Sequence, residues 1–369
     1  MKFASFLFGN AYPVRRMLDV RCESKVGLAG IMKILGIEFA PLFLPVARRL
    51  QTAAVIYTTA GFMLGGLLCT LLCVYLLFFT QYYFVPLIYL AWYIVDRETP
   101  KRGGRASDWV RRWKLWKYER DYFPIELVKT AELDSNKNYI MGYHPHGITA
   151  FGAQCNFATE ATDFSKVFPG IKPHPLTLNL NFKFPFTREL LMFYGMCSVD
   201  RESLVWILTK QGTGNAAIIV IGGAQEALYA HKGSYVLELK KRKGFARYAL
   251  KCGADLVPVF SFGENDIFSQ VKNPPGSILR RFQESCKRLT TVSPVVFYGR
   301  GIFQYNYGYL PYRSRIVTVV GKPISVAKVE EPTQEQVDSL HRKYVDQLKE
   351  LFEEHKTRYG AANCALEII

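Results

Sequence analysis

Histidine is scarce in this chain, and charge is missing from one long stretch of it. Only 6 of the 369 residues are histidine, and no Lys, Arg, Asp or Glu occurs from Gln51 to Val95. A run of this length is too long for a buried core helix, because one membrane span needs only about 20 apolar residues. The run can hold two short spans or one membrane-embedded helical hairpin, and we expect the hairpin.

Cations flank this run on both sides: Arg48 and Arg49 before it, and Arg97, Lys101, Arg102 and Arg105 after it. Cationic residues tend to stay on the cytosolic side of a membrane, so both ends of the hairpin are expected to face the cytosol. Gly65-Gly66 and Thr80-Gln81 are both possible turns. The pattern does not choose between these two positions.

A cleavable signal is missing from the N-terminus, where the apolar core is too short and no small-residue cleavage site precedes the next charges. The hairpin is therefore expected to target the chain. The stretch from Val26 to Leu44 is apolar but is interrupted by Lys33, Glu38 and Pro41. This pattern favours an interfacial segment over a further span.

The eight cysteines have no metal-type spacing, and no Asn-X-Ser/Thr sequon occurs. Both observations fit a reduced, cytosolic setting for the main domain, with the cysteines as small buried hydrophobic residues. No G-x-S-x-G elbow is present, which argues against an ordinary serine hydrolase.

The net charge of +16 is compatible with a nucleic-acid surface, with anionic lipid or with a phosphate-bearing substrate. The long apolar run and the lack of any nucleic-acid motif argue against the first. After the run, basic residues alternate with Trp109, Trp113 and Trp116. This composition is typical of an interfacial segment.

From about Asp121 onward, β-rich runs alternate with helical patterns. The candidate strands are 138–143, 216–223, 256–263 and 315–323, and the candidate helices are 202–210, 244–252, 277–289 and 333–356. Thr333 and Gln336 form a capping-box pattern at the start of the last helix. The alternation predicts one α/β domain with a largely parallel or mixed sheet.

His144 and His146 stand two apart, directly after the predicted strand that ends at Tyr143. Open α/β sheets usually carry their active groups at strand ends, and an imidazole can take a proton from an alcohol at neutral pH. A pair of structural histidines or two metal ligands would also fit, although no Cys, Asp or Glu cluster completes a metal site. The spacing alone leaves these roles open.

A second candidate is the turn of Gly222, Gly223 and Glu226 after the strand 216–223. The glycines could present backbone N–H groups to an oxyanion, and the carboxylate could orient an imidazole. An ordinary strand-to-helix turn with an acidic residue at the helix start has the same sequence.

Two basic segments could bind phosphate. Lys240 to Lys243 and Arg247 surround Gly244, and Arg300, Arg313 and Arg315 lie in a Gly- and Tyr-rich stretch. The segment around Gly244 could equally be a solvated charged face. The Gly- and Tyr-rich stretch could have a structural role or could bind substrate.

These blocks together resemble the type 2 diacylglycerol acyltransferase family, which includes monoacylglycerol and wax alcohol acyltransferases. The resemblance covers nearly everything from residue 121 to the C-terminus. It is carried by Tyr122-Phe123-Pro124, His144-Pro145-His146-Gly147, Pro173-His174, Gly222-Gly223 with Glu226, and the stretches 242–264, 273–283 and 299–324.

The resemblance implies transfer of a fatty acyl group from acyl-CoA to a lipid alcohol at the endoplasmic reticulum and lipid droplets. It also implies a relationship to the glycerolipid acyltransferase fold, whose histidine is followed five residues later by Asp. Thr149 stands at that position here. The missing aspartate makes Glu226 the candidate for the orienting group.

On this basis we expect His144 to act as general base, with His146 and N–H groups near Gly147, Gly222 or Gly223 stabilising the oxyanion. The CoA phosphates would meet Lys241, Arg242, Lys243, Arg247 and Arg300. No cofactor or metal is expected. A covalent enzyme intermediate is not required either, and nothing near Cys155 would lower the pKa of its thiol.

The expected organisation is an N-terminal segment (1–49), a membrane-embedded hairpin (50–96), a basic Trp-rich linker (97–120) and a cytosol-facing domain (121–369). The domain is expected to be a glycerolipid-acyltransferase-like α/β unit with a mixed sheet and flanking helices. The acceptor is expected to be diacylglycerol or 2-monoacylglycerol. A wax alcohol acyltransferase and a non-catalytic, hairpin-anchored lipid-binding protein are the alternatives, and a homo-oligomer is compatible with each.

Overall fold

A seven-stranded sheet forms the centre of the computed structural model, which describes residues 32–34, 36–41, 43–290 and 293–369. Neighbouring strands run parallel, except that β12 and β9 are antiparallel. The predicted α/β class with a largely parallel, mixed sheet is thereby confirmed. The strands lie in the order β3 (Glu126–Lys129), β12 (Val317–Val320), β9 (Asp255–Phe262), β4 (Tyr139–His144), β7 (Asn215–Val220), β5 (Lys172–Thr177) and β6 (Cys197–Ser198).

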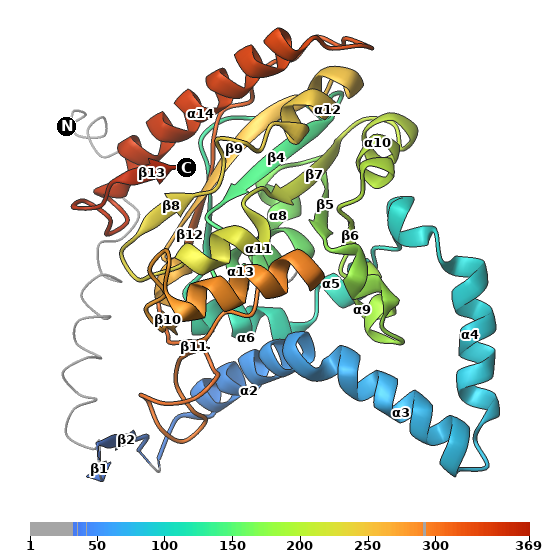
Figure 1. Ribbon diagram of the computed structural model, residues 1–369, viewed down its shortest axis with the longest axis vertical. Helices are drawn as coiled ribbons and strands as arrows, with labels where there is room; N and C mark the ends of the chain where they lie inside the picture. The colour runs from blue at the N-terminus through green and yellow to red at the C-terminus, as the bar shows by residue number, and fades with distance from the viewer. Residues whose placement is uncertain (1–31, 35, 42, 291–292) are drawn as a thin grey trace, which may run out of the picture.

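The central strands are buried on both faces because helices cover the sheet from two sides (Figure 1). Side chains alternate along a strand, so Ile140 and Phe260 pack against one layer of helices and Met141 and Val257 against the other. The first layer contains α10 (Arg201–Lys210), α12 (Gly244–Cys252) and α14 (Gln334–Lys356), and the second α8 (Phe164–Val167) and the π-helical turn Gln154–Ala158.

The predicted helices are present, and α12 has the predicted bounds. Thr333 accepts a hydrogen bond from the backbone N of Gln336, whose side chain bonds back to the Thr333 N–H, so the capping box is confirmed. Apart from α2 to α4, which are described below, the other α-helices are α5 (Asp108–Arg111), α6 (Lys114–Tyr122), α7 (Phe151–Ala153), α9 (Thr187–Phe193), α11 (Gly223–Glu226) and α13 (Ile278–Thr290). The strands outside the central sheet are β1 (Met32–Ile34), β2 (Ile37–Phe39), β8 (Tyr235–Leu237), β10 (Ser269–Gln270), β11 (Phe297–Tyr298) and β13 (Leu366–Ile368).

The apolar run forms one 34-residue helical segment, Val46–Phe79, which is long and apolar enough to cross a membrane. It consists of α2 (Val46–Ala60), a π-helical stretch Gly61–Gly65 and α3 (Gly66–Phe79). Ala54 and Val55 of α2 are buried against the domain, whereas α3 has no buried residue. Figure 1 shows α3 leaving the domain at the bend that follows α2.

The chain turns back at 80–83, the second of the two turns considered, and continues as α4 (Phe84–Asp96). The 13 residues of α4 extend about 20 Å, less than the roughly 30 Å of a hydrocarbon core. A paired membrane hairpin therefore stays a prediction, and the long apolar helix is what the structure shows.

Hydrogen bonds and ion pairs connect both ends of the segment from α2 to α4 to the domain. Thr58 of α2 donates a 2.7 Å hydrogen bond to the carboxyl group of Glu119, whose burial raises its pKa to about 8. Arg188 is fully buried and donates to Asp96 at 2.9 Å and to Glu189 at 2.6 Å. Asp96 ends α4, so the pair with Arg188 fixes where that helix rejoins the domain.

The Trp-rich segment folds as α5 and α6, and α6 packs against α2. Trp109 is 74% exposed, but Trp116 is buried and donates from its indole N–H to the Val110 carbonyl at 2.7 Å. Trp116 is therefore a packing residue. No disulfide bond is present among the seven described cysteines. The predictions for residues 1–31, including the missing signal and the start of the interfacial segment, lie outside the described residues.

Replacing Arg188 is expected to destabilise the protein. Arg188→Ala would leave the Asp96 carboxylate with Arg105 and Thr99 as its side-chain partners, and removing one member of a buried ion pair costs about 3 kcal/mol. The measurement is the midpoint of thermal unfolding in detergent, compared with Lys166→Ala, which breaks an exposed pair with Asp163 and should change little. Equal midpoints for the two variants would contradict a stabilising role for Arg188.

Candidate active site

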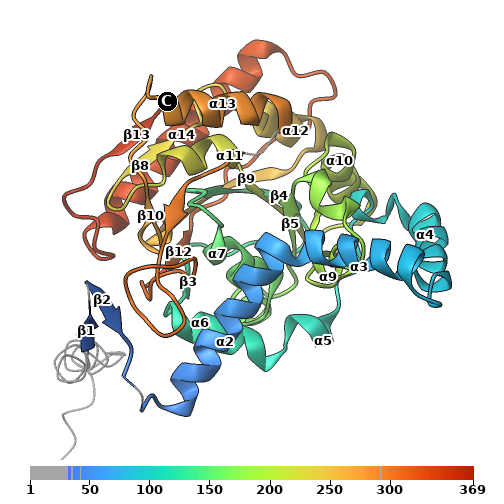
Figure 2. The same cartoon turned by 60° about the horizontal axis from the view of Figure 1, so that its bottom comes forward.

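A large apolar cavity of about 1240 Å³ lies between the sheet and the bend that joins α2 to α3. This volume exceeds the roughly 300–1,000 Å³ of ordinary small-molecule pockets. One wall is the helical bend, and the other is made by the last residues of β5 and β7 and by residues that follow β4. Figure 2 shows α2 and α3 passing in front of the sheet. Its lining includes Tyr57 to Thr59, Gly61 to Met63, Gly65 to Leu67, His146, Ile148 to Phe151, Pro175 to Leu178, Ile218 to Ile221 and Lys241 to Phe245.

His146 lines the cavity in a defined tautomer. Its Nδ1 lies 3.0 Å from the carbonyl oxygen of Gly147. A carbonyl can only accept, so Nδ1 carries the proton and Nε2 keeps a free lone pair. Burial lowers the pKa of this imidazole below its ordinary value, which keeps the ring neutral at neutral pH. A neutral imidazole with a free Nε2 can accept a proton from a bound hydroxyl.

His144 is fully buried behind the cavity wall and does not line the cavity. Its Nε2 lies 3.1 Å from the Tyr344 hydroxyl, which itself donates to the Gly142 carbonyl at 3.1 Å. The hydroxyl therefore accepts from the His144 N–H. Desolvation lowers the pKa of His144 to about 3, so the ring is neutral.

Strand geometry explains why the two histidines separate. His144 is the last residue of β4 and shares a face with Ile140 and Gly142, which α14 covers. His146 lies beyond the strand and faces the cavity. The structure thus places the predicted base away from the cavity and the predicted oxyanion partner on it.

Glu226 holds the backbone of the histidine loop, which we define as residues 144–152. Its Oε1 accepts from the backbone N of His146 at 2.6 Å, and its Oε2 accepts from the backbone N of Glu238 at 3.1 Å. These bonds are made to the main chain instead of to an imidazole ring, and burial raises the pKa of Glu226 to about 7. A Cβ on Gly222 would lie 2.0 Å from Glu226 Oε2, so this position needs glycine.

Glu264 holds the same loop from the other side, and sequence reasoning gave it no role. Its Oε2 accepts from the Tyr143 hydroxyl at 2.9 Å and from the backbone N of Gly152 at 3.0 Å. Gly147 has a φ of +61°, and a Cβ there would lie 2.7 Å from Glu264 Cγ. Burial raises the pKa of Glu264 to about 7. The available signal was its place two residues after the end of β9.

Three of the five predicted CoA-binding cations line the cavity: Lys241, Arg242 and Lys243. Lys243 also pairs with Asp338 at 2.8 Å. Arg247 donates to Gln334 at 2.6 Å outside the cavity lining, and Arg300 is buried, where it donates to the Gly301 carbonyl at 3.1 Å. The structure therefore does not bring Arg247 and Arg300 to the cavity.

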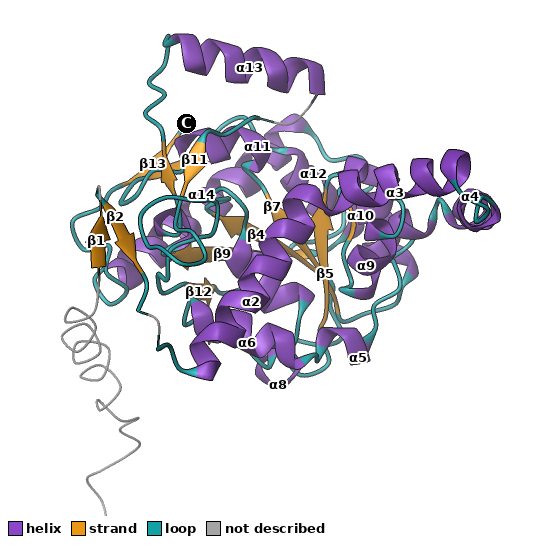
Figure 3. Ribbon diagram, turned by 90° about the horizontal axis from the view of Figure 1, so that it is seen from below, coloured by secondary structure: helices purple, strands orange, loops and turns teal. Residues whose placement is uncertain are grey.

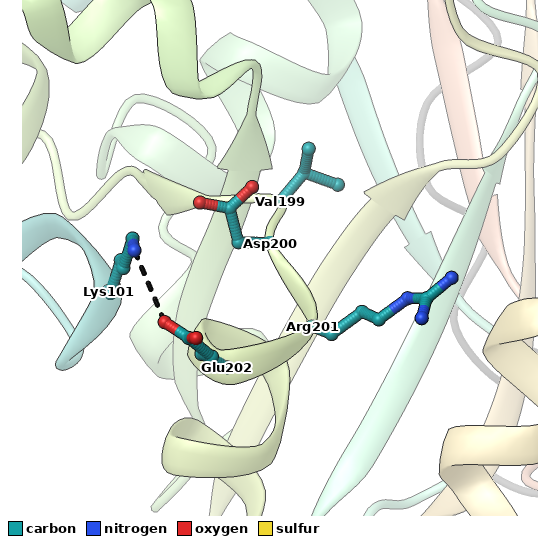
Figure 4. Close-up of a pocket in the computed structure, with 5 residues that line it drawn as sticks. All are labelled: Lys101, Val199, Asp200, Arg201 and Glu202. Carbon is teal, nitrogen blue, oxygen red and sulfur yellow. Dashed lines mark hydrogen bonds and ion pairs between the residues drawn. The ribbon is translucent and has the colours of Figure 1, made fainter.

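Arg201 is a cavity cation that the sequence analysis did not identify. It also borders a shallow hollow of about 410 Å³ on the outer side, where Lys101 pairs with Glu202 at 3.2 Å. Figure 4 shows the Arg201 side chain extending away from that pair. Of the predicted glycines, Gly223 lines the cavity, whereas Gly147 and Gly222 lie behind its wall.

Cys155 is buried, and burial raises the pKa of its thiol well above the ordinary value. The thiol is therefore protonated at neutral pH and poorly nucleophilic. Among the described residues, no group of three His, Cys, Asp or Glu side chains could hold a metal ion.

A neutral histidine on the wall of a lipid-sized cavity, next to a helix that can enter a membrane, defines a class of membrane-associated enzymes that act on lipids. The chain belongs to the diacylglycerol acyltransferase family, whose model matches residues 75–368.

Relatives of both acceptor types are similar to this chain. A 2-acylglycerol O-acyltransferase 1 of Bos taurus is 49% identical over 88% of this chain and 96% of its own length. A diacylglycerol O-acyltransferase 2 of Danio rerio is 50% identical over 85% of this chain and 87% of its own length. Among solved structures, a 1-acyl-sn-glycerophosphate acyltransferase of Thermotoga maritima covers 85% of this chain and 99% of its own, at 13% identity and a TM-score of 0.38, a similarity too low to bear on fold or function.

Glu264→Ala is expected to lower activity, because the Tyr143 hydroxyl and the Gly152 N–H would lose their buried acceptor. Glu264→Gln keeps an acceptor oxygen and resembles the neutral acid, so it should retain most activity at pH 6, below the pKa of about 7. Acyl transfer by both variants at pH 6 is the measurement. If the two variants lost activity equally, the role of Glu264 as a hydrogen-bond acceptor would be contradicted.

Proposed function

We propose that the protein transfers a fatty acyl group from acyl-CoA to the hydroxyl group of diacylglycerol or 2-monoacylglycerol in triacylglycerol synthesis. The observation that carries this proposal is His146, which lines an apolar cavity together with several cations and whose Nδ1–H···O bond to Gly147 leaves Nε2 as the proton acceptor. The names of the relatives support both acceptors at nearly equal identity, so neither is preferred.

In the proposed mechanism, His146 Nε2 takes the proton of the acceptor hydroxyl as its oxygen attacks the thioester carbonyl. The tetrahedral intermediate then expels the CoA thiolate, which receives the same proton from the imidazolium. Glu226 holds the peptide of His146, and His144 supports the loop from beneath. The peptide N–H of Gly223, on the cavity wall, is the predicted donor that best fits the oxyanion.

The CoA phosphates are proposed to contact Lys241 and Arg242, with Arg201 as a further cation on the same cavity. The acyl chain and acceptor would fill the apolar part of the cavity. Acyl-CoA is a substrate in this scheme, and no cofactor takes part.

We further propose a glycerolipid-acyltransferase-like domain anchored by α3 and α4 in the endoplasmic reticulum membrane, with both termini cytosolic and access to lipid droplet surfaces. The exposed apolar surface of α3 supports the anchor. The cations at both ends of the uncharged run support the orientation.

His146→Ala is expected to lower acyl transfer about 10²-fold or more, because a general base contributes roughly 10²–10⁴-fold. His144→Gln keeps an N–H donor for Tyr344 and should retain most activity. The measurement is thin-layer analysis of lipids formed from labelled oleoyl-CoA in membranes with equal protein content. Diacylglycerol, 2-monoacylglycerol and a long-chain alcohol are offered separately.

Labelled triacylglycerol would identify diacylglycerol as the acceptor, and labelled diacylglycerol would identify 2-monoacylglycerol. Labelled wax ester would show that the acceptor is a long-chain alcohol and would contradict the proposed acceptor. A loss with His144→Gln as large as with His146→Ala would return the base role to His144. No labelled product with any acceptor would leave a non-catalytic lipid-binding protein.

Lys241→Ala and Arg242→Ala are each expected to raise the KM for acyl-CoA about tenfold, since a hydrogen bond to a charged group is worth about 1.5–3 kcal/mol. Arg247→Ala is the matched control, because Arg247 bonds to Gln334 away from the cavity. Initial rates at varied acyl-CoA check this. A larger KM for Arg247→Ala than for Lys241→Ala would contradict the assignment.

A further inference from the structure

Large apolar side chains gather on an exposed loop between β11 and β12, which we call the aromatic loop (residues 299–310). Phe303 is 77% exposed, Tyr309 67%, Tyr307 58% and Ile302 46%. None of these four lines the lipid cavity. Exposed groups of large apolar side chains are characteristic of surfaces that bind a membrane or another protein.

The main chain of the aromatic loop satisfies many of its own hydrogen bonds. Gly299 N donates to the Gly308 carbonyl at 2.7 Å, and Arg300 and Leu310 exchange two backbone bonds of 2.7 and 2.9 Å. The side-chain oxygen of Gln304 accepts from the backbone N of Tyr307 at 2.9 Å. Paired backbone groups beneath outward apolar side chains suit a lipid environment, where unpaired backbone groups are costly.

The aromatic loop is joined to the segment that leads into α2. Ala40 N donates to the Phe303 carbonyl, and Tyr305 N to the Glu38 carbonyl, both at 2.8 Å. Arg313 donates to Gln51 of α2 at 2.6 Å. In Figure 1 the chain between β11 and β12 lies beside β2 and the start of α2, at the lower edge, and Figure 3 views this side from below.

The turn between α3 and α4 lies at the same lower edge, at the other end of the bent helix (Figure 1). The first residues of this helical region, Phe43 and Val46, are 94% and 71% exposed. The exposed cation Arg48 follows them. Aromatic rings next to cations are characteristic of the membrane–water interface.

We propose that the aromatic loop, together with Phe43 and Val46, inserts into the interfacial region of the bilayer as a second membrane contact besides α3. Continuity with the helix that can enter a membrane favours a bilayer over a second copy of the chain. The two contacts hold the two ends of the bent helix, and the cavity wall at Gly61–Gly65 lies between them.

The test is photocrosslinking of the full-length protein in vesicles of phosphatidylcholine and phosphatidylserine that contain a clickable phospholipid. p-Benzoylphenylalanine replaces Phe303, Tyr307 or Tyr309 in separate preparations. Leu71 of α3, 54% exposed, serves as the positive control. The exposed Lys349 serves as the negative control, because its helix, α14, lies away from β1, β2 and α2 (Figure 1). Lipid adducts at 303, 307, 309 and 71 but not at 349 are expected.

Adducts at 71 with none at 303, 307 or 309 would overturn the proposal. Crosslinks from these positions to a second copy of the chain, seen as a band of twice the mass, would overturn it as well. A Phe303→Ser/Tyr307→Ser double variant should lose the adduct from position 309 while the adduct from position 71 persists. Crosslinking needs no turnover, so its outcome is independent of the proposed acyl transfer.

Discussion

The position of His146 depends on the parallel register of three strands. β4 ends in the histidine loop, and its two neighbours in the sheet are β7 and β9. Glu226 follows β7 and Glu264 follows β9, so the sheet delivers one buried carboxyl group to each side of the loop. Because each group accepts hydrogen bonds from the loop main chain, a shift of any of these strands would move the imidazole.

The bent helix adds a constraint of a different kind. The first part, α2, packs against the domain through Val55 and through the hydrogen bond from Thr58 to Glu119. The second part, α3, has no buried residue. The pair of Arg188 with Asp96 returns the chain to the domain after α4. The part that can enter a membrane is therefore fixed to the domain at both ends, which limits how far the domain can rotate relative to the bilayer.

Much of the fold could be predicted from the sequence because its central elements have simple patterns. β4 and β9 are continuous apolar runs, and α12 and α14 have clear amphipathic periods and ends. β5 was missed because Pro173, His174 and Pro175 are poor strand residues, although its neighbour β7 supplies the pairing partners. Such a strand is stabilised by tertiary context.

The candidate site was predicted less completely, because the sequence does not show the direction in which each side chain points. The spacing in the sequence puts His144 and His146 close together but does not show which way each ring points. In the folded protein His144 contacts Tyr344 of α14, whereas His146 lines the cavity. The same holds for the basic segment, where Lys241 and Arg247 are close in sequence yet lie on different surfaces. Which side chains share a surface depends on contacts between segments far apart in the sequence.

The π-helical stretch Gly61–Gly65 has a consequence for kinetics. It lines the cavity and is also the point where the helix leaves the domain for its exposed apolar half. If α3 lies in a membrane, as proposed, a lipid that diffuses along that half reaches the cavity without crossing water, and its search takes place in two dimensions. The rate should then follow the mole fraction of acceptor in the surrounding monolayer, and dilution of the membranes in buffer should leave the turnover per enzyme unchanged.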